Sequence, residues 1–300
     1  MKKILIMLAL ASVFSMNAQI ATVVSKTPIL KGVETDMNSP VLSPDGTKLL
    51  FCSANYSNLR MLDFATGEVT VVAKDDRSGF DALFTPDSRE IYFVTERDGE
   101  GGLKMRQLKK YNIAKGETKA LSEEMRLVRR PAVSDKGFSV NTDKKSLKKG
   151  SVGIAVRAED SRLIITRNGV DHEYSPVEAY AGYLWPTLSP DRTKVAFVAA
   201  GKGVYVTDLE GNILAHLDNR RYEAPSWYGN DFIITQLTTD DGHQLHSSQL
   251  VINRADGSAS QALTAPESMT MSPAADIDNN RIIYATVDGL LYEMKININK

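Results

Sequence analysis

Two histidines lie three residues apart in a polar stretch that also carries aspartates. The stretch reads "TTDDGHQLHSSQ" and places His243 and His246 beside Asp240 and Asp241. Neutral imidazoles together with a carboxylate can bind zinc or manganese. The spacing is not reliably helical and no third ligand is visible, so histidines of a solvated loop are the alternative interpretation. This pair is the only metal-binding hypothesis that the sequence offers.

Other catalytic patterns are incomplete. His172 in "DHEYSP" resembles the start of a zinc-protease motif, but Pro176 stands where the second histidine belongs. The sequence contains no Gly-x-Ser-x-Gly nucleophile motif, no phosphate-binding loop and no dinucleotide fingerprint. Cys52 follows Leu50 and Phe51 in an apolar run, which is typical of a buried structural thiol. The sequence therefore predicts no catalytic residues and no cofactor.

Arginine and aromatic residues recur in three similar segments, each of which contains a proline. The segments are "VRRPAV", "GYLWPTL" and "RYEAPSW". Their candidate binding residues are Arg129, Arg130, Tyr183, Trp185, Tyr222 and Glu223. Such side chains at a concave surface suit a peptide, a sugar or an acidic ligand. The alternative is that the aromatic rings pack inside the fold and the arginines pair with nearby acids.

These segments belong to an internal repeat. The stretch "VLSPDGTKLLF" has five relatives: "DALFTPDSREIYFVT", "RPAVSDKG", "WPTLSPDRTKVAFVA", "APSWYGNDFIITQ" and "SPAADIDNNRIIYAT". Equivalent positions are Pro40, Ala82, Pro131, Pro186, Pro225 and Pro273, with a mean spacing of 46.6 residues. That period is typical of a four-stranded propeller blade. Six such units account for nearly the whole chain, so the sequence predicts an all-β, six-bladed β-propeller of antiparallel blades.

The ends of the chain suggest how the ring closes. The last repeat stops after its expected third strand, while the apolar segment 20–31 precedes the first repeat without a partner of its own. We expect this N-terminal strand to complete the last blade, because closure removes exposed sheet edges. The third repeat is irregular and includes "DKGFSVNTDKKSLKKGS", whose strand assignment stays open. Its lysines fit either a solvated loop or a surface for an acidic partner or membrane.

The Ser-Pro-Asp turns have a complete structural explanation. Proline presets φ, aspartate can bond nearby backbone amides, and Gly46 can accept a positive φ. We therefore expect Asp45, Asp87 and Asp191 to be turn residues only. In an up-and-down blade all these turns lie on one face, so function is expected on the opposite face. There the six arginine, aromatic and acidic candidates would ring the mouth of a central channel.

The repeat resembles a known family. The sixfold arrangement and the turns in "LSPDGTKLLF" and "LSPDRTKVAF" are similar to the propeller family of TolB, the periplasmic component of the Tol system. The resemblance implies a TolB-like fold over nearly the whole mature chain. TolB also carries an α/β domain ahead of its propeller, and only about 20 residues are available for one here. TolB's fold is implied, and its role is not.

The first residues predict export. "MKKILIMLALASVFSMNA" has two lysines, an apolar run and a small-residue end, which is the plan of a secretory signal peptide ending at Ala18. The apolar run is too short to span a bilayer, which takes roughly 20 residues. We therefore expect a signal peptide at 1–18 and a single propeller domain at 19–300. The expected location is the periplasm, or the cell surface after secretion.

Charge and cysteine content narrow the partners. The chain has 36 basic and 37 acidic residues, so no strongly basic domain is present and nucleic acid is excluded as a partner. With one cysteine it can form no internal disulfide. We expect a monomer without a transmembrane segment after signal removal. Its partner would be an envelope protein, a peptide or a glycan.

Two functions from different classes follow. The first is a non-enzymatic binding or scaffold propeller of the bacterial envelope, whose partner docks at the channel mouth. The alternative is a metal-dependent propeller enzyme similar to the oligogalacturonate lyases, with His243 and His246 as ligands and an arginine holding a uronate carboxylate. Those lyases are longer and use more convergent histidines than this sequence supplies.

Overall fold

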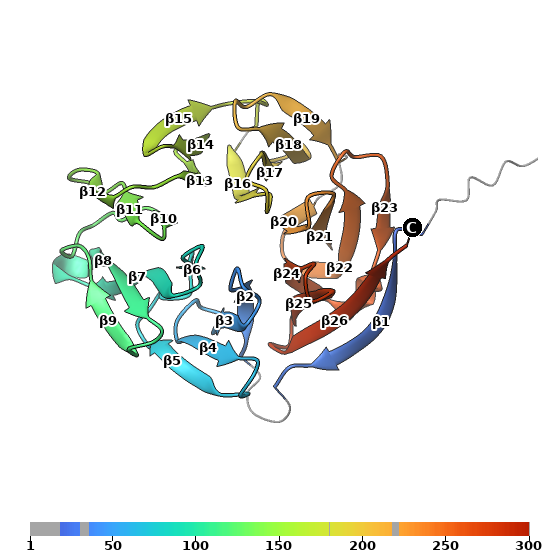
Figure 1. Cartoon of the computed structure of the whole chain (residues 1–300), viewed down its shortest axis with the longest axis horizontal. Coiled ribbons are helices and arrows are strands. Elements are labelled where there is room, and N and C mark those ends of the chain that lie inside the picture. The colour runs from blue at the N-terminus through green and yellow to red at the C-terminus, as the bar shows by residue number, and fades with distance from the viewer. Residues whose placement is uncertain (1–18, 31–35, 180, 218–221, 300) are drawn as a thin grey trace, which may run out of the picture.

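The computed structural model describes residues 19–30, 36–179, 181–217 and 222–299. The predicted signal peptide, residues 1–18, lies outside the described residues. Within them the chain forms 26 β-strands and two short 3₁₀ turns, η1 (Glu100–Gly102) and η2 (Pro266–Ser268). The strands make seven antiparallel sheets arranged as blades around a central axis (Figure 1). No helix in these ranges is long and apolar enough to cross a membrane.

Five blades have four strands. From the centre outward, the first of them is β2 (Asn38–Leu42), β3 (Lys48–Cys52), β4 (Leu59–Asp63) and β5 (Val69–Ala73), and the second is β6 (Leu83–Phe84), β7 (Glu90–Asp98), β8 (Lys104–Asn112) and β9 (Glu117–Ala120). The third is β16 (Tyr183–Leu188), β17 (Lys194–Ala199), β18 (Gly203–Asp208) and β19 (Ile213–His216), and the fourth is β20 (Tyr222–Tyr228), β21 (Phe232–Asp240), β22 (Leu245–Arg254) and β23 (Ser260–Ala262). The fifth is β24 (Thr270–Asp276), β25 (Arg281–Thr286), β26 (Leu291–Ile298) and β1 (Ala21–Pro28).

Two blades have three strands. They are β10 (Ala132–Ser134), β11 (Gly137–Val140) and β12 (Leu147–Gly150), and then β13 (Ile154–Glu159), β14 (Arg162–Arg167) and β15 (Val170–Tyr174). The irregular third repeat is thereby assigned, because Phe138 lies in the second strand of its blade and Lys144 in the loop that follows. Lys148 and Lys149 lie in β12.

The strands form where the sequence predicts them, because blades pack face to face and bury both sides of their second strand. Near-continuous apolar runs result: Leu49 to Cys52 in β3 and Ile91 to Val94 in β7 are all buried. Adjacent blades share these residues in common hydrophobic clusters, such as Leu50 with Phe93. The core is therefore a series of clusters between neighbouring blades.

Ring closure by the N-terminal strand is confirmed. β1 pairs antiparallel with β26, with Ala21 opposite Ile298 and Pro28 opposite Tyr292. Ile20 and Ala21 are buried in the same cluster as Met294. The first strand of the described chain thus completes the last blade (Figure 1).

The expectation of six blades is wrong, because the structure has seven. The repeat markers lie at the start of innermost strands, and these strands begin at a central cavity. β13 instead ends there, since Ala158 lines that cavity. β13 is nevertheless the innermost strand of its blade, because it packs against the innermost strand β16 of the next blade, and the buried apolar run of this blade lies in β14. The β13–β15 blade therefore lacks its outermost strand, and its innermost strand runs in the opposite direction to those of the other blades. Because this reversed strand does not begin at the cavity, the blade carries no marker, and the interval from Pro131 to Pro186 holds an uncounted blade.

The Ser-Pro-Asp turns make the hydrogen bonds that the sequence predicts. Asp45 Oδ1 accepts hydrogen bonds from Ser43 Oγ at 2.6 Å and from the Thr47 amide at 3.0 Å. Asp191 Oδ1 is bound in the same way by Ser189 Oγ and the Thr193 amide. These turns join the first and second strands and define what we call the turn face. The face on which the innermost strands begin is called the open face.

Candidate functional site

A cavity of about 620 Å³ lies at the centre of the open face. Every blade contributes to its lining, six of them near the start of the innermost strand and the seventh through Ala158. Representative lining residues, one for each of those six blades, are Pro40, Asp81, Arg130, Trp185, Glu223 and Ser272. The cavity therefore occupies the channel mouth where the sequence places a binding site.

Left-handed residues shape this mouth. Ser39, Asp81, Trp185, Ala224 and Ser272 occupy equivalent positions and have φ values of 52°, 59°, 46°, 46° and 52°. In four of these blades the pairing register between the first and second strands shifts at this point, as in a β-bulge. A left-handed non-glycine residue costs on the order of 1–3 kcal/mol. The ring thus holds the same local strain at five places around one cavity.

The bulge at Trp185 turns its indole toward solvent. Trp185 is 46% exposed and Leu184 is 40% exposed, although Tyr183 immediately before them is only 5% exposed. Regular alternation would place residues 183 and 185 on the same side of the strand. The bulge breaks that alternation and presents an indole ring at the cavity.

An aromatic pair lines another part of the cavity. The rings of Tyr56 and Phe80 meet edge to face, with centroids 5.1 Å apart. The Arg77 guanidinium lies 3.9 Å from the centre of the Phe80 ring. Burial and the neighbouring Arg106 lower the pKa of Arg77. Sequence reasoning missed this pair, because Tyr56 and Phe80 lie in loops outside the repeat; only their position in open-face loops could have indicated them.

Charged groups of both signs face the same space. Arg130 Nη1 lies 3.6 Å from Asp81 Oδ1, and each of the two side chains is about one-third exposed. The Glu223 carboxylate accepts hydrogen bonds from Thr238 Oγ1 at 3.3 Å and from Gln236 Nε2 at 3.5 Å. Gln236 Oε1 in turn accepts from the Ser272 amide at 2.9 Å. The carboxylate is thereby fixed to the blade wall.

The structure separates the six predicted site residues. Arg130, Trp185 and Glu223 line the central cavity together. Tyr183 also borders it, but its ring is buried and its hydroxyl donates to the Val177 carbonyl at 2.5 Å.

One of the candidates does not line the cavity, and the side chain of another lies outside the described residues. Arg129 is absent from its lining and pairs with Asp160 at 2.5 Å and with Glu159 at 3.4 Å. Tyr222 begins β20 opposite Leu237, and its side chain lies outside what the structure describes.

The histidine pair lies on the β21–β22 loop, also at the open face. His246 Nε2 is 3.1 Å from Asp241 Oδ2, and Asp241 Oδ1 accepts the backbone amides of His243 and Gln244. These hydrogen bonds lower the pKa of Asp241, and the bond from the Gln244 amide has the largest effect. Both histidines are exposed. Among the described residues no group of three or more His, Cys, Asp or Glu side chains is arranged to hold a metal ion.

Fold, ring closure and cavity together define a seven-bladed β-propeller with an open central mouth. A chain of the crystal structure of a mitotic checkpoint complex superimposes with a TM-score of 0.64 at 12% identity, covering 98% of each chain. The Cps50 (Swd1) β-propeller domain of Myceliophteria thermophila gives 0.64 at 6% identity, covering 92% of this chain and all of that one. An oligogalacturonate lyase in complex with manganese gives 0.51 at 14% identity, covering 90% and 79%. Identities this low establish the fold alone.

TolB is also among the solved structures to which this chain is similar. TolB from Acinetobacter baumannii superimposes with a TM-score of 0.47 at 16% identity, covering 87% of this chain and 56% of that one. No protein-family model matches the sequence, and no curated protein matches it either. What the comparisons support is therefore membership of the propeller fold class.

Proposed function

We propose that this protein is an exported, non-enzymatic binding propeller that captures a ligand at its central cavity. The observation that carries the proposal is the single space of about 620 Å³ to which all seven blades contribute. Exposed Trp185 and Leu184 give it an apolar side, and the partly exposed Arg130–Asp81 pair gives it a polar one. Concave sites with aromatic walls and a few placed polar groups are typical of ligand capture.

The lining favours a ligand with an apolar group and a carboxylate, such as a peptide end or an acidic sugar. Arg130 is held by Asp81 at 3.6 Å rather than by a close bidentate bond, so a carboxylate of the ligand could engage it. Trp185 offers a face for an apolar side chain or a sugar ring. Export to the envelope rests on the signal-like N-terminus and belongs to the same proposal.

The test is crosslinking and pull-down from native bacterial envelopes with the mature protein as bait. Arg130→Ala with Trp185→Ala forms the cavity variant. The matched control is Arg192→Ala with Val287→Ala, because both residues are exposed and neither lines the central cavity. We expect a partner retained by the wild type and the control but lost from the cavity variant. A partner that binds all three equally would place binding elsewhere and overturn the site assignment.

The metal-dependent lyase alternative has one supporting observation, the contact of His246 with Asp241 near His243. Manganese titration of the purified protein tests it. A rise in melting temperature on adding manganese that disappears in His243→Ala with His246→Ala would favour this alternative. An unchanged melting temperature would leave the binding propeller as the better interpretation.

A further inference from the structure

The seam between blades β6–β9 and β10–β12 changes character from the inside outward. Across the first blade one row of facing residues runs Leu83, Tyr92, Lys110 and Lys119 from β6 to β9. Across the second blade the corresponding row is Val133, Phe138 and Lys149. The inner members pack together as a hydrophobic cluster. The outer members are lysines, so this seam is apolar near the axis and cationic near the perimeter.

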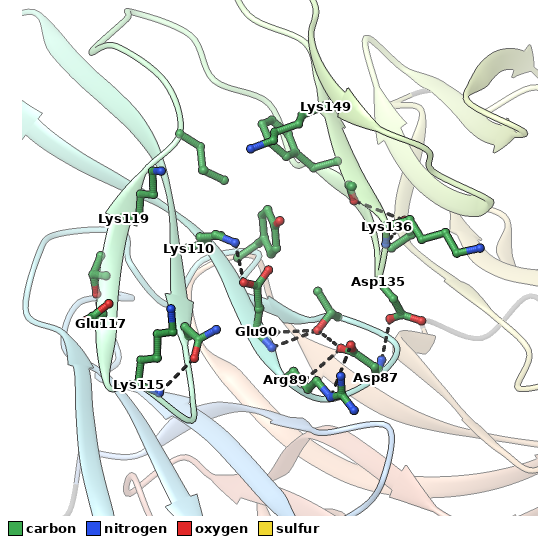
Figure 2. A pocket seen from close by; sticks show the side chains of 18 residues that line it. Asp87, Arg89, Glu90, Lys110, Lys115, Glu117, Lys119, Asp135, Lys136 and Lys149 are labelled. Carbon is green, nitrogen blue, oxygen red and sulfur yellow. Dashed lines mark hydrogen bonds and ion pairs between the residues drawn. The ribbon is translucent and has the colours of Figure 1, made fainter.

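A cleft of about 590 Å³ opens where the lysines begin. Tyr92 and Phe138 form its floor, with ring centroids 5.8 Å apart, and both are buried. Burial, and to a lesser extent the negative charge of Glu90, raises the pKa of Tyr92 to about 12, so the phenol stays neutral. Figure 2 shows Lys149 extending from one wall toward the wall that carries Lys119.

The positive charge in this cleft is only partly neutralised. Lys110 Nζ pairs with Glu90 at 2.5 Å on the floor of the cleft. Within the described residues no ion pair is made by Lys119 or Lys149, and both are exposed. The carboxylate of Asp87 is bound by the Thr85 hydroxyl and the Arg89 amide, so it is held within its own turn. The whole lining has six basic and four acidic side chains, so the cleft carries a net positive charge, and the ammonium groups of Lys119 and Lys149 face it.

The cleft exists because the second blade lacks a fourth strand. The sheet ends at β12, and the chain then passes through residues 151–153 directly to β13 of the next blade. Apart from its pairing with β11, β12 shows no backbone hydrogen bond to another described segment. In the neighbouring blade β9 occupies the fourth position. An unpaired strand edge is a template for an extended polypeptide.

We propose that the cleft binds an extended acidic peptide segment, which adds to β12 as the fourth strand of its blade. Alternate side chains of such a strand point to one face. Acidic residues at every second position would therefore face Lys110, Lys119 and Lys149, while the peptide backbone pairs with the free edge. Charge complementarity selects an acidic ligand, and the vacant strand position selects a polypeptide over a polyanionic glycan. This site is separate from the central cavity and does not depend on its function.

The probe is a fluorescent heptapeptide, Thr-Glu-Thr-Glu-Thr-Glu-Thr, titrated with the mature protein at low and moderate salt. The cleft variant is Lys119→Glu with Lys149→Glu. The matched control is Lys74→Glu with Lys202→Glu, which makes the same change of charge at exposed positions outside the cleft. Melting temperatures establish that both variants are folded. A second peptide carries N-methyl groups at alternate backbone amides, and oligogalacturonate is the competing polyanion.

We expect saturable binding that weakens with salt, falls at least tenfold in the cleft variant and changes less than threefold in the control. N-methylation should weaken binding by at least fivefold, because it removes backbone pairing. The Arg130→Ala, Trp185→Ala variant should bind the peptide normally, which separates this result from the central-cavity test. The proposal would be overturned if the peptide did not bind at low salt, or if the cleft variant bound it as well as the wild type does. It would also be overturned if N-methylation had no effect on binding, or if oligogalacturonate displaced the peptide at equal charge concentration.

Discussion

Arg281 Nη2 donates a hydrogen bond to the Gly46 carbonyl, joining the last blade to the first across 235 residues of sequence. Arg281 is only 6% exposed, and its Nε also donates to Asp276 Oδ2 at 2.9 Å. Its guanidinium lies 4.1 Å from the centre of the Phe64 ring of the first blade. One buried side chain therefore contacts both sides of the seam where the ring closes.

Arg281→Ala should destabilise the protein by about 2–4 kcal/mol, because it leaves the Asp276 carboxylate partly buried without its partner. Urea denaturation followed by tryptophan fluorescence measures the loss. Arg254→Ala is the matched control, since Arg254 also lies over an aromatic ring, Phe232 at 5.5 Å, but is exposed. We expect less than about 1 kcal/mol for the control. Equal losses for both variants would contradict a special role for the closing seam.

Gly46→Ala should also destabilise, by about 1–3 kcal/mol. Gly46 has φ of +68°, and a Cβ there would lie 2.6 Å from Asn279 Nδ2 and 2.8 Å from Asp276 Oδ2 of the last blade. Arg192 occupies the equivalent turn position with φ of 58° and is exposed, so Arg192→Ala serves as the control. Differential scanning calorimetry should show a lower melting temperature only for Gly46→Ala. An unchanged value would mean that the two turns can move apart at little cost.

Turn aspartates should contribute stability that depends on pH. The Ser189 hydroxyl, above all, lowers the pKa of Asp191 against a smaller opposing effect of burial. A carboxyl whose folded-state pKa is lowered stabilises the fold above its unfolded value, near 4, and loses that contribution as pH falls through the folded value. Asp191→Asn should therefore lose stability at pH 6, by less than about 1 kcal/mol because the side chain is exposed, and little at pH 2.5. The prediction would be contradicted if the difference in stability between the wild type and Asp191→Asn were larger at pH 2.5 than at pH 6.

Tyr183 and Trp185 should separate stability from binding. Tyr183 is buried edge to face against Phe197 at 5.2 Å, so Tyr183→Ala should cost about 3–5 kcal/mol. Trp185→Ala should cost under about 1 kcal/mol, because the indole is 46% exposed. Urea midpoints of the two variants measure the difference. Comparable losses would show that the indole also supports the fold.

Cys52 should resist thiol reagents in the folded protein. Its side chain is buried, and burial raises the pKa of the thiol to about 11. Since the thiolate is the reactive form, only about one thiol in a thousand is ionised at pH 8. Labelling with a chromogenic disulfide should be slow in buffer and rapid in 6 M guanidinium, a concentration chosen to unfold the chain. Rapid labelling in buffer would mean that β3 opens frequently.

Strands, turns and ring closure could be predicted from the sequence because local chemistry specifies them. The buried run from Leu49 to Cys52 and the turn around Asp45 are examples. The number of blades could not be predicted, since the repeat signal lies at the start of innermost strands that begin at the central cavity, whereas the innermost strand β13 ends there. The mean spacing matched six blades because two short, three-stranded blades share the single interval from Pro131 to Pro186.

The candidate site was predictable only in position. Arg130, Trp185 and Glu223 were found because they lie at the start of innermost strands. The roles of Arg129 and Tyr183 depend on side-chain direction, which the bulges and the acids at Glu159 and Asp160 determine. The ion pairs of Arg129 join residues about 30 positions apart in the chain, so they leave no pattern in the local sequence.

The passage from β12 to β13 also limits how such rings can vary in length. Neighbouring strands of a blade run in opposite directions, so omission of one strand would reverse every later strand and misplace each following turn. Here the missing positions are two, the outermost strand in each of two consecutive blades, and the 26 strands of the described chain are two fewer than seven complete blades require. Chain polarity is therefore restored by residue 183. A closed ring of this kind can gain or lose strands only in even numbers.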